Sequence, residues 1–187
     1  LKVIKNDHLT GPMAWDTSSY NFWDSPSTLN TYLNGTFYNT LPAAVQNNVV
    51  NHNFNTGDYV YNNDDLAAHI AREATKKWNG KIGLISVSDF LRSNSNITQC
   101  STIKTSDANK SICKTTNYLI STVDYWTITT FDYSLTAASV VMSSGYIYMS
   151  SDWTDTGNFY YVRPTMFLKS SITLSGAGTS TDPYTIN

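Results

Sequence analysis

The segment "NFYYVRPTMFLKSS", residues 158–171, places an arginine and a proline inside an otherwise hydrophobic run. Such a run predicts a β-strand, but Pro164 has no backbone N–H to donate to a neighbouring strand. The strand must therefore be interrupted, or lie at a sheet edge, at that position. Arg163 also needs a fixed partner, because an unpaired charge among apolar side chains is costly. It is a structural residue, a ligand contact or a catalytic cation.

Composition excludes one class of function and favours another. The chain has 187 residues, which fits one domain, and 41% of them are apolar, which is enough for a core. Only 14% are charged, the net charge is −2 and no basic run occurs, so nucleic acid is not an expected partner. A surface built from Tyr, Ser, Thr and Asn is typical of extracellular and wall-associated proteins. We therefore expect an extracellular protein at the cell surface.

The start of the chain predicts how it relates to a membrane. The longest apolar runs are too short to cross a bilayer. The chain opens on the strand-like "LKVI" without a signal peptide. We therefore expect a mature or trimmed form, attached to a membrane only through a missing N-terminal segment.

The two cysteines bracket a polar segment without periodicity. Cys100 and Cys113 enclose "STIKTSDANKSI", which predicts a surface loop closed by a disulfide. The alternative is a pair of free thiols in a reducing compartment. A zinc site is less favoured, because His8, His52 and His69 lack ligand spacing to these cysteines.

Hydrophobic periodicity divides the chain into a helical part and a strand-rich part. An amphipathic helix is expected over residues 25–41, with Ser25 as its cap, Pro26 in its first turn and apolar residues every four positions: Leu29, Leu33, Phe37 and Leu41. Shorter helices are expected from Pro42 and over residues 64–78, and a buried strand over residues 80–88. Later segments read as strands, with a hairpin over residues 138–150. The pattern predicts an α+β fold, with helices in the first half and an antiparallel meander sheet in the second.

The motifs, taken together, resemble those of a family of bacterial surface proteins, mostly Gram-positive, with a C-type-lectin-like core. That core is also used by formylglycine-generating enzymes. The resemblance rests on "KVIKND" (2–7), "MAWDT" (13–17), "LNTYLNGTFYNTL" (29–41), "WNGKIGLISVSDF" (78–90), "YWTI" (125–128), "YVRPTMFLKSSITLSGAGTSTDPYTI" (161–186) and the spaced cysteines.

The resemblance implies one C-type-lectin-like domain over residues 1–187, lacking one N-terminal strand. It implies structural roles for Trp78, Trp126, Arg163 and Pro164. Arg163 would tie the central strand to long loops and pair with an aspartate such as Asp89 or Asp16. Such domains often follow type IV prepilin-like helices or occur in adhesin-like proteins.

Candidate catalytic residues are sparse. Five aspartates are available for paired-carboxylate chemistry, but no spacing favours a pair: Asp7, Asp16, Asp58, Asp89 and Asp124. Glu73 is the only glutamate and is expected on a helix surface. The two cysteines do not match the paired reactive cysteines of formylglycine-generating enzymes. We expect a protein that is not an enzyme and that has no catalytic residues or cofactor.

Calcium is the one metal that the loops favour. The segment "SDWTDTGN" offers Asp152, Asp155 and Asn158 as oxygen ligands, and a second segment offers Asp58, Asp64 and Asp65. The alternative for both segments is that these side chains cap helices or form turns.

Aromatic residues among small polar ones point to a binding surface. Tyr146, Tyr148, Trp153 and Tyr160 lie among Ser, Asn and Asp residues, a mixture that is typical of contact surfaces. Alternate tyrosines on one strand share a face. The alternative is that half of these rings belong to the core.

Three functions are open. The first is a cell-surface or pilus-associated adhesin-like domain that binds an extracellular glycan or protein. The second is the head domain of a structural pilin or filament subunit, whose surface contacts neighbouring subunits. The third is a secreted hydrolase.

Overall fold

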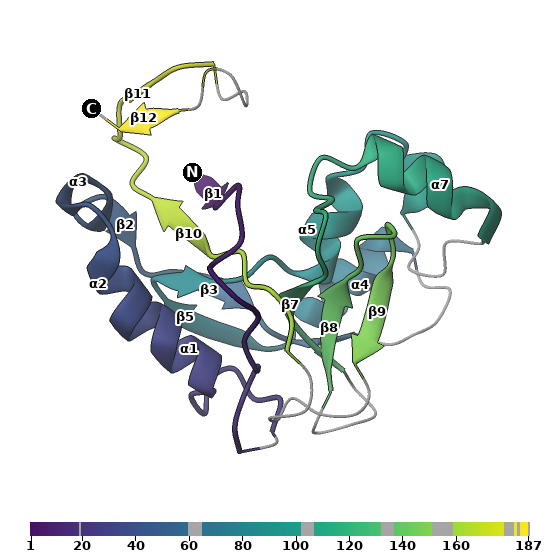
Figure 1. The fold of residues 1–187 in the computed structure, drawn as a ribbon, viewed down its shortest axis with the longest axis horizontal. Helices are drawn as coiled ribbons and strands as arrows, with labels where there is room; N and C mark the ends of the chain where they lie inside the picture. Colours follow the sequence, from purple (N-terminus) through teal and green to yellow (C-terminus); the bar gives the residue numbers. More distant parts are fainter. Residues whose placement is uncertain are drawn as a thin grey trace.

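The computed structural model describes residues 1–18, 20–59, 65–101, 107–131, 137–150, 159–177, 182 and 184–186. The protein is α+β with mainly antiparallel sheets (Figure 1). Helices are not confined to the first half, because α6 (Ile97–Cys100) and α7 (Asp107–Thr116) lie beyond it, and six short strands precede them. No helix in the described ranges is long and apolar enough to cross a membrane.

The first sheet is built around β10 (Thr165–Leu168), which follows Arg163 and Pro164. β10 pairs antiparallel with β1 (Lys2–Ile4) along one edge. Its other edge takes two strands end to end, β2 (Val49–Val50) and β6 (Ile82–Gly83). The sheet therefore joins both ends of the chain to its middle, which differs from the predicted division into halves.

The long helix predicted over residues 25–41 forms in three consecutive parts: α1 (Thr28–Tyr32), a π-helical turn (Leu33–Phe37) and α2 (Tyr38–Thr40). Its cap is Ser27 rather than Ser25, because the Ser27 hydroxyl accepts from the Asn30 N–H. Leu29, Leu33 and Phe37 are buried, as the periodicity predicted. The helix ends at Leu41 before Pro42, and α3 (Ala43–Gln46) begins there.

Asn34 ties the π-helical turn to the first sheet. Its side-chain amide donates to the Ile82 carbonyl at 2.8 Å and its oxygen accepts from the Ile82 N–H at 3.0 Å. The side chain thus pairs with β6 as a neighbouring strand would. This contact holds the helix beside β6.

The second sheet contains the predicted meander. β7 (Tyr125–Phe131), β8 (Ala138–Val141) and β9 (Ile147–Ser150) pair antiparallel in chain order, and β4 (Asp58–Tyr59) pairs parallel with β7. Two further pairs complete the strands: β3 (His52–Asn55) with β5 (Lys77–Gly80), and β11 (Leu174–Ser175) with β12 (Thr185–Ile186).

Two helices follow capping signals in the sequence. α4 (Leu66–Glu73) begins at Asp65, whose carboxylate caps it by accepting from the Ala68 N–H. It ends before residue 78, the predicted end, because Lys77–Gly80 form β5. α5 (Val87–Arg92) begins at Ser86, which forms a capping box with Asp89. The strand predicted over residues 80–88 is therefore only two residues long, because its second half is the entrance to α5.

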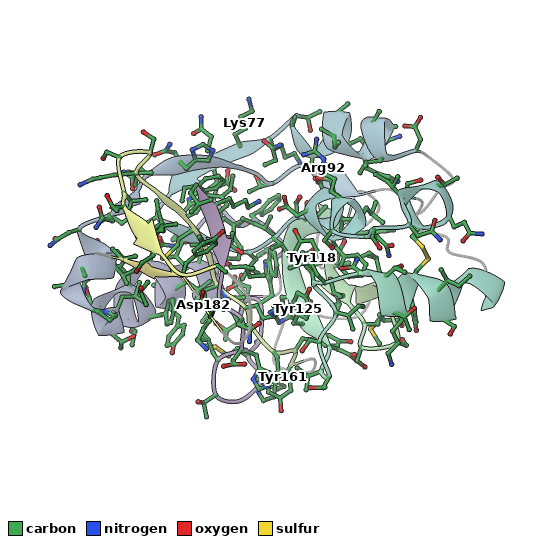
Figure 2. All side chains as sticks on the ribbon, turned by 90° about the horizontal axis from the view of Figure 1, so that it is seen from above. Lys77, Arg92, Tyr118, Tyr125, Tyr161 and Asp182 are labelled. Atoms are coloured by element: carbon green, nitrogen blue, oxygen red, sulfur yellow. A yellow bond between two sulfur atoms is a disulfide. The ribbon has the colours of Figure 1, made fainter. Side chains whose placement is uncertain are left out.

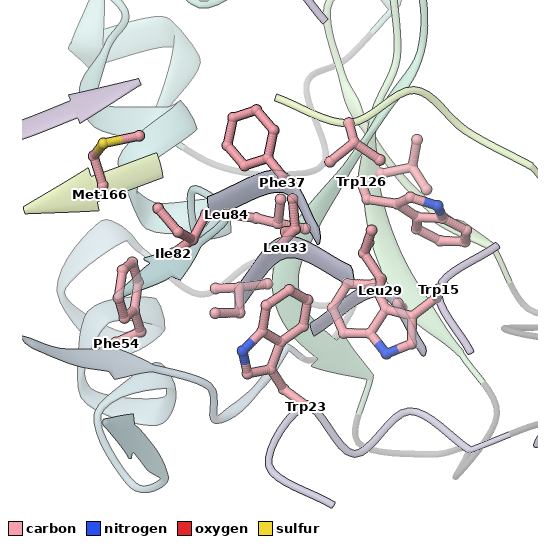
Figure 3. Packing of buried hydrophobic residues seen from close by; sticks show 14 of the residues in the cluster. Trp15, Trp23, Leu29, Leu33, Phe37, Phe54, Ile82, Leu84, Trp126 and Met166 are labelled. Carbon is pink, nitrogen blue, oxygen red and sulfur yellow. The ribbon is translucent and has the colours of Figure 1, made fainter. Parts of the chain in front are cut away.

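The hydrophobic core divides into two clusters. The larger lies between α1, its π-helical continuation and the sheets, and Figure 3 shows Trp15 and Trp126 at one end and Phe54 and Met166 at the other. Trp126 is fully buried, and its ring meets Trp15 edge to face at 5.7 Å. The smaller cluster joins α5 to β7, β8 and β9, through residues such as Phe90 and Leu91.

Arg163 does not have the predicted carboxylate partner. The guanidinium donates to the Leu119 carbonyl at 2.7 Å and to the Lys5 carbonyl at 3.3 Å, and lies 5.1 Å from the centre of the Tyr125 ring. Asp89 instead pairs with Lys2, and Asp16 accepts from Thr28. In the described ranges, backbone carbonyls and the Tyr125 side chain take the place of the predicted carboxylate.

The segment before β10 is interrupted, as Pro164 requires. Tyr160 and Tyr161 form isolated bridges to Met13 and Tyr125, and residues 162–164 belong to no strand. The Pro164 carbonyl accepts from the Lys5 N–H, and the Val162 carbonyl accepts from the Leu9 N–H. The N-terminal segment therefore satisfies the backbone at the interruption.

The disulfide between Cys100 and Cys113 is present, as predicted. The segment that it closes is not a loop throughout, because residues from Asp107 onward form α7 and Cys113 lies within that helix. The bond joins α6 to α7, and both cysteines are buried.

Loss of this disulfide should cost stability. Reducing it, or replacing both Cys100 and Cys113 with serine, is expected to lower the free energy of unfolding by about 3 kcal/mol, because the unfolded chain regains the freedom of the closed loop. Urea titrations with and without reductant measure the difference. Superimposable titrations would show that the bond adds no stability.

Candidate functional site

Two adjoining pockets form a groove between β1 and α5. The first has a volume of about 280 Å³ and the second about 330 Å³. Both are lined by Lys2, Asp89 and Arg92, so we refer to them together as the β1–α5 groove. Its apolar lining comes from both core clusters, for example Leu84 from the larger and Ile85 from the smaller. The groove therefore lies where the two clusters meet.

An ion pair crosses the groove. The Lys2 ammonium on β1 contacts the Asp89 carboxylate on α5, which also accepts from the Ser86 N–H at 2.9 Å. The capping box fixes Asp89 in the first turn of α5, where the helix dipole favours a negative charge. Local helix capping thus places the acidic wall of the groove.

The first pocket combines an exposed ring with a buried hydroxyl. Tyr118 lies on its rim and is 79% exposed. Thr165 of β10 also lines the pocket and is fully buried, and its Oγ1 has no hydrogen-bond partner among the described residues. Arg92 lines the same pocket, and Figure 2 labels both side chains.

The second pocket is walled by polar side chains. Its lining includes His52, Asn53 and Asn55 of β3, and the His52 ring stacks on Phe167 with 3.6 Å between the ring centres. Partial burial lowers the pKa of His52, and the positive charge of Lys2 lowers this pKa further. The lowered pKa favours the neutral form of His52.

Arg92 is the uncompensated charge of the groove. It lies in the last turn of α5 with an exposed side chain. Among the described residues it makes no ion pair or hydrogen bond. Because Lys2 and Asp89 offset each other, Arg92 leaves the groove with a net positive charge.

The buried side chain of Glu73 fixes the position of a residue that lines the groove. Glu73 is 1% exposed rather than on the helix surface, because this side of α4 packs against α5. It accepts from the Ser88 N–H at 3.1 Å, from the Thr129 hydroxyl at 2.8 Å and from the Ser88 hydroxyl. Burial raises the pKa of Glu73, although these hydrogen bonds oppose the rise. Glu73 fixes Ser88, a lining residue of the second pocket.

Glu73 should make stability depend on pH. Because its pKa in the folded protein lies above the ordinary 4.5, the folded state holds the proton more tightly than the unfolded state. The resulting stability is present below the unfolded pKa and is lost as pH rises through the folded pKa. The Glu73→Gln variant, which is neutral throughout, should therefore gain stability relative to the wild type as pH rises from about 4 to 7. Urea unfolding across that range measures the difference, and parallel profiles would contradict it.

The comparison with protein families gives a match over most of the chain. Residues 3–170 match the family described as "Domain of unknown function (DUF6273)". The chain belongs to the DUF6273 family. Comparisons with curated proteins and with solved structures gave no match.

The DUF6273 match covers the groove except for Lys2, which directly precedes the matched span. The matched span ends before β11 and β12. The two sheets and both core clusters therefore lie almost entirely within the DUF6273 region, and the groove is a feature of that region.

The tyrosines singled out in the sequence are not gathered at one place. Tyr146 and Tyr148 lie at the β8–β9 hairpin, and Tyr148 is 43% exposed. Tyr160 packs edge to face on Trp126 at 4.7 Å, on the opposite side of β7 from β8. Trp153 lies outside the described residues, as do the suggested calcium ligands Asp152, Asp155 and Asn158.

Three of the other suggested acids, Asp58, Asp65 and Asp124, hold elements of this DUF6273 domain in place, and Asp64 lies outside the described residues. Asp58 accepts from Lys76 and Thr130, Asp65 caps α4, and Asp124 accepts from the Ser143 N–H at 2.7 Å. No group of three or more His, Cys, Asp or Glu side chains gathers for a metal in the described ranges.

The tryptophans named as structural lie in the larger cluster. The Trp126 indole donates to the Met13 carbonyl at 2.8 Å. Trp78 meets Trp23 edge to face at 5.9 Å, and its ring covers Gly80, where an added Cβ would lie 2.0 Å from the ring. Gly80 therefore leaves the space that Trp78 occupies.

Sequence reasoning missed the β1–α5 groove. Its residues come from several segments that lie far apart in the sequence, among them Lys2, His52 to Asn55, Leu84 to Arg92, Tyr118 and Thr165. The capping box at Ser86 and Asp89 was the one local signal, and it predicts a helix start rather than a pocket.

Proposed function

We propose that this chain is an extracellular, non-enzymatic binding domain of C-type-lectin-like type, which binds a glycan or protein ligand in the β1–α5 groove at the cell surface. The observation that carries the proposal is the groove itself, where a free arginine and a highly exposed tyrosine lie beside a fixed ion pair. Concave sites with a few placed polar groups are the usual form of ligand sites.

Two further observations support the extracellular part of the proposal. The disulfide fits an oxidising compartment, where such bonds form and persist. The low share of charged residues and the abundance of Tyr, Ser, Thr and Asn are typical of extracellular contact surfaces. Asp16, Asp58 and Asp124, three of the five aspartates available to a hydrolase, are held in structural hydrogen bonds, which supports binding over catalysis.

A glycan and protein array with the purified domain tests this function. We expect the strongest ligand to bind the Tyr118→Ala variant about tenfold more weakly, because exposed tyrosines often dominate contact energies. Tyr148→Ala, the same change on the β8–β9 hairpin, serves as the matched control and should bind as the wild type does.

Three outcomes would contradict the proposal. If Tyr148→Ala loses binding and Tyr118→Ala does not, the binding site lies on the β8–β9 hairpin rather than in the groove. Turnover of an array compound would show an enzyme. Ordered filaments of the purified protein in micrographs, together with an empty array, would favour the filament-subunit alternative.

A further inference from the structure

We infer that the β1–α5 groove recognises the carboxylate of an acidic glycan, with Arg92 as the residue that binds the carboxylate. This inference rests on the proposed function and names the ligand class for the same site. It follows from the charge of the groove, the nature of its exposed walls and the ring beside Arg92.

The charge of the groove selects an anion. Three charged side chains line it, and two of them, Lys2 and Asp89, are already paired. Arg92 has no partner in the described part of the chain and is exposed to an incoming ligand. A guanidinium binds a carboxylate through two parallel hydrogen bonds, which gives both strength and orientation.

The exposed walls favour a glycan over a peptide. The accessible lining of the second pocket is more polar than apolar, since Phe54, Leu84 and Ile128 are buried and its other apolar residues, Ile70 and Phe167, are half-buried. The accessible polar groups include the imidazole of His52 and the amide of Asn55, whereas the Asn53 amide oxygen already accepts from the Asn79 side chain. An amide both donates and accepts, which suits the hydroxyl groups of a sugar.

The first pocket adds a ring and a hydrogen-bonding floor. Tyr118 exposes a flat ring beside Arg92, which can pack against the apolar face of a sugar. The Thr165 hydroxyl is a polar group in the lining that the described part of the chain leaves unpartnered. Volumes of about 280 and 330 Å³ lie at the small end of ligand pockets, so each pocket suits a short saccharide unit.

Calorimetry with defined probes tests the inference. The probes are tetragalacturonate, the same tetramer with its carboxyl groups reduced to alcohols, and a tetraglutamate peptide. We expect tetragalacturonate to bind, and the reduced tetramer and the peptide to bind at least about tenfold more weakly. Binding should weaken as salt is added, because a partly exposed charge pair is screened.

Variants assign the effect to Arg92. Arg92→Gln should weaken tetragalacturonate binding about tenfold, and Arg92→Lys should weaken it less, because the charge remains but the two-pronged geometry is lost. Lys77→Gln is the matched control: it removes one exposed positive charge on β5 that lies outside the groove lining (Figure 2). Circular dichroism checks that each variant is folded.

The results of these experiments distinguish the acidic-glycan assignment from the proposed binding function on which it rests. Equal binding of the reduced tetramer, equal binding of tetraglutamate, no binding of tetragalacturonate, or an unaffected Arg92→Gln variant would each overturn the acidic-glycan assignment. If the array ligand still requires Tyr118 in that case, the binding function stands and only the ligand class is wrong. If the array ligand requires neither Tyr118 nor Arg92, both proposals fail.

Discussion

Replacing Trp126 with alanine should leave the chain barely folded. The side chain is fully buried, packs against Trp15 and Tyr160, and donates its indole N–H to the Met13 carbonyl. Truncating a buried tryptophan costs about 3 to 5 kcal/mol through lost burial and the cavity that remains. The unfolding free energy of most domains is only about 5 to 15 kcal/mol. Urea unfolding followed by near-ultraviolet circular dichroism should show the loss.

Two variants make this result specific. Trp126→Phe keeps a ring in the core but removes the N–H, so it should cost much less than Trp126→Ala. Tyr118→Ala removes an aromatic ring that is 79% exposed and should leave the urea midpoint unchanged. A Trp126→Ala protein that unfolds at the same urea concentration as the wild type would contradict the packing described for the larger cluster.

Replacing Arg163 with alanine should lower the free energy of unfolding by about 3 kcal/mol. The side chain is 5% exposed, and its guanidinium donates to the carbonyls of Leu119 and Lys5. The Lys5 carbonyl belongs to the segment beside β10, and the Leu119 carbonyl to the segment that carries Tyr118. Removing the guanidinium takes one donor from each carbonyl, although the Leu119 carbonyl keeps the Tyr125 hydroxyl at 2.8 Å, and it opens a cavity beside Tyr125.

Arg163→Lys keeps the positive charge, so its free energy of unfolding should fall by about half as much as that of Arg163→Ala. The ammonium group lacks the spread of donors that lets the guanidinium reach both carbonyls. Arg92→Ala, at an exposed arginine without a described partner, is the matched control and should change the midpoint little. If Arg163→Ala unfolds like the wild type but loses a ligand, Arg163 belongs to a binding site and its structural assignment is wrong.

The sequence was informative where one local pattern decides the structure. Leu29, Leu33 and Phe37 predicted the helix and its buried face, because periodicity reports directly on which side meets the core. Pro164 predicted the interruption before β10 because a missing N–H has the same effect in any fold. The polar segment between Cys100 and Cys113 was predicted to be a loop, but part of it forms the helix α7. The disulfide, rather than a clear apolar stripe, holds this helix in place.

The groove and the buried carboxylate depend on contacts between distant segments. Glu73 looked like a surface residue because its partners Ser88 and Thr129 are 15 and 56 positions away. The expected partner of Arg163 was a carboxylate, because a charge usually signals an opposite charge. Backbone carbonyls of Leu119 and Lys5 take that place, and no side-chain pattern reveals them. For the same reason, Lys2 and Arg92 could not be recognised as neighbours.

Hydrogen–deuterium exchange of the domain, free and saturated with its strongest array ligand, tests the central claim most directly. The β1–α5 groove predicts slower exchange in bound protein for peptides that cover residues 52–55, 86–92 and 117–119. Peptides from the β8–β9 hairpin should exchange equally in both states. Protection confined to that hairpin, with the groove peptides unchanged, would contradict the assignment of the binding site to the β1–α5 groove.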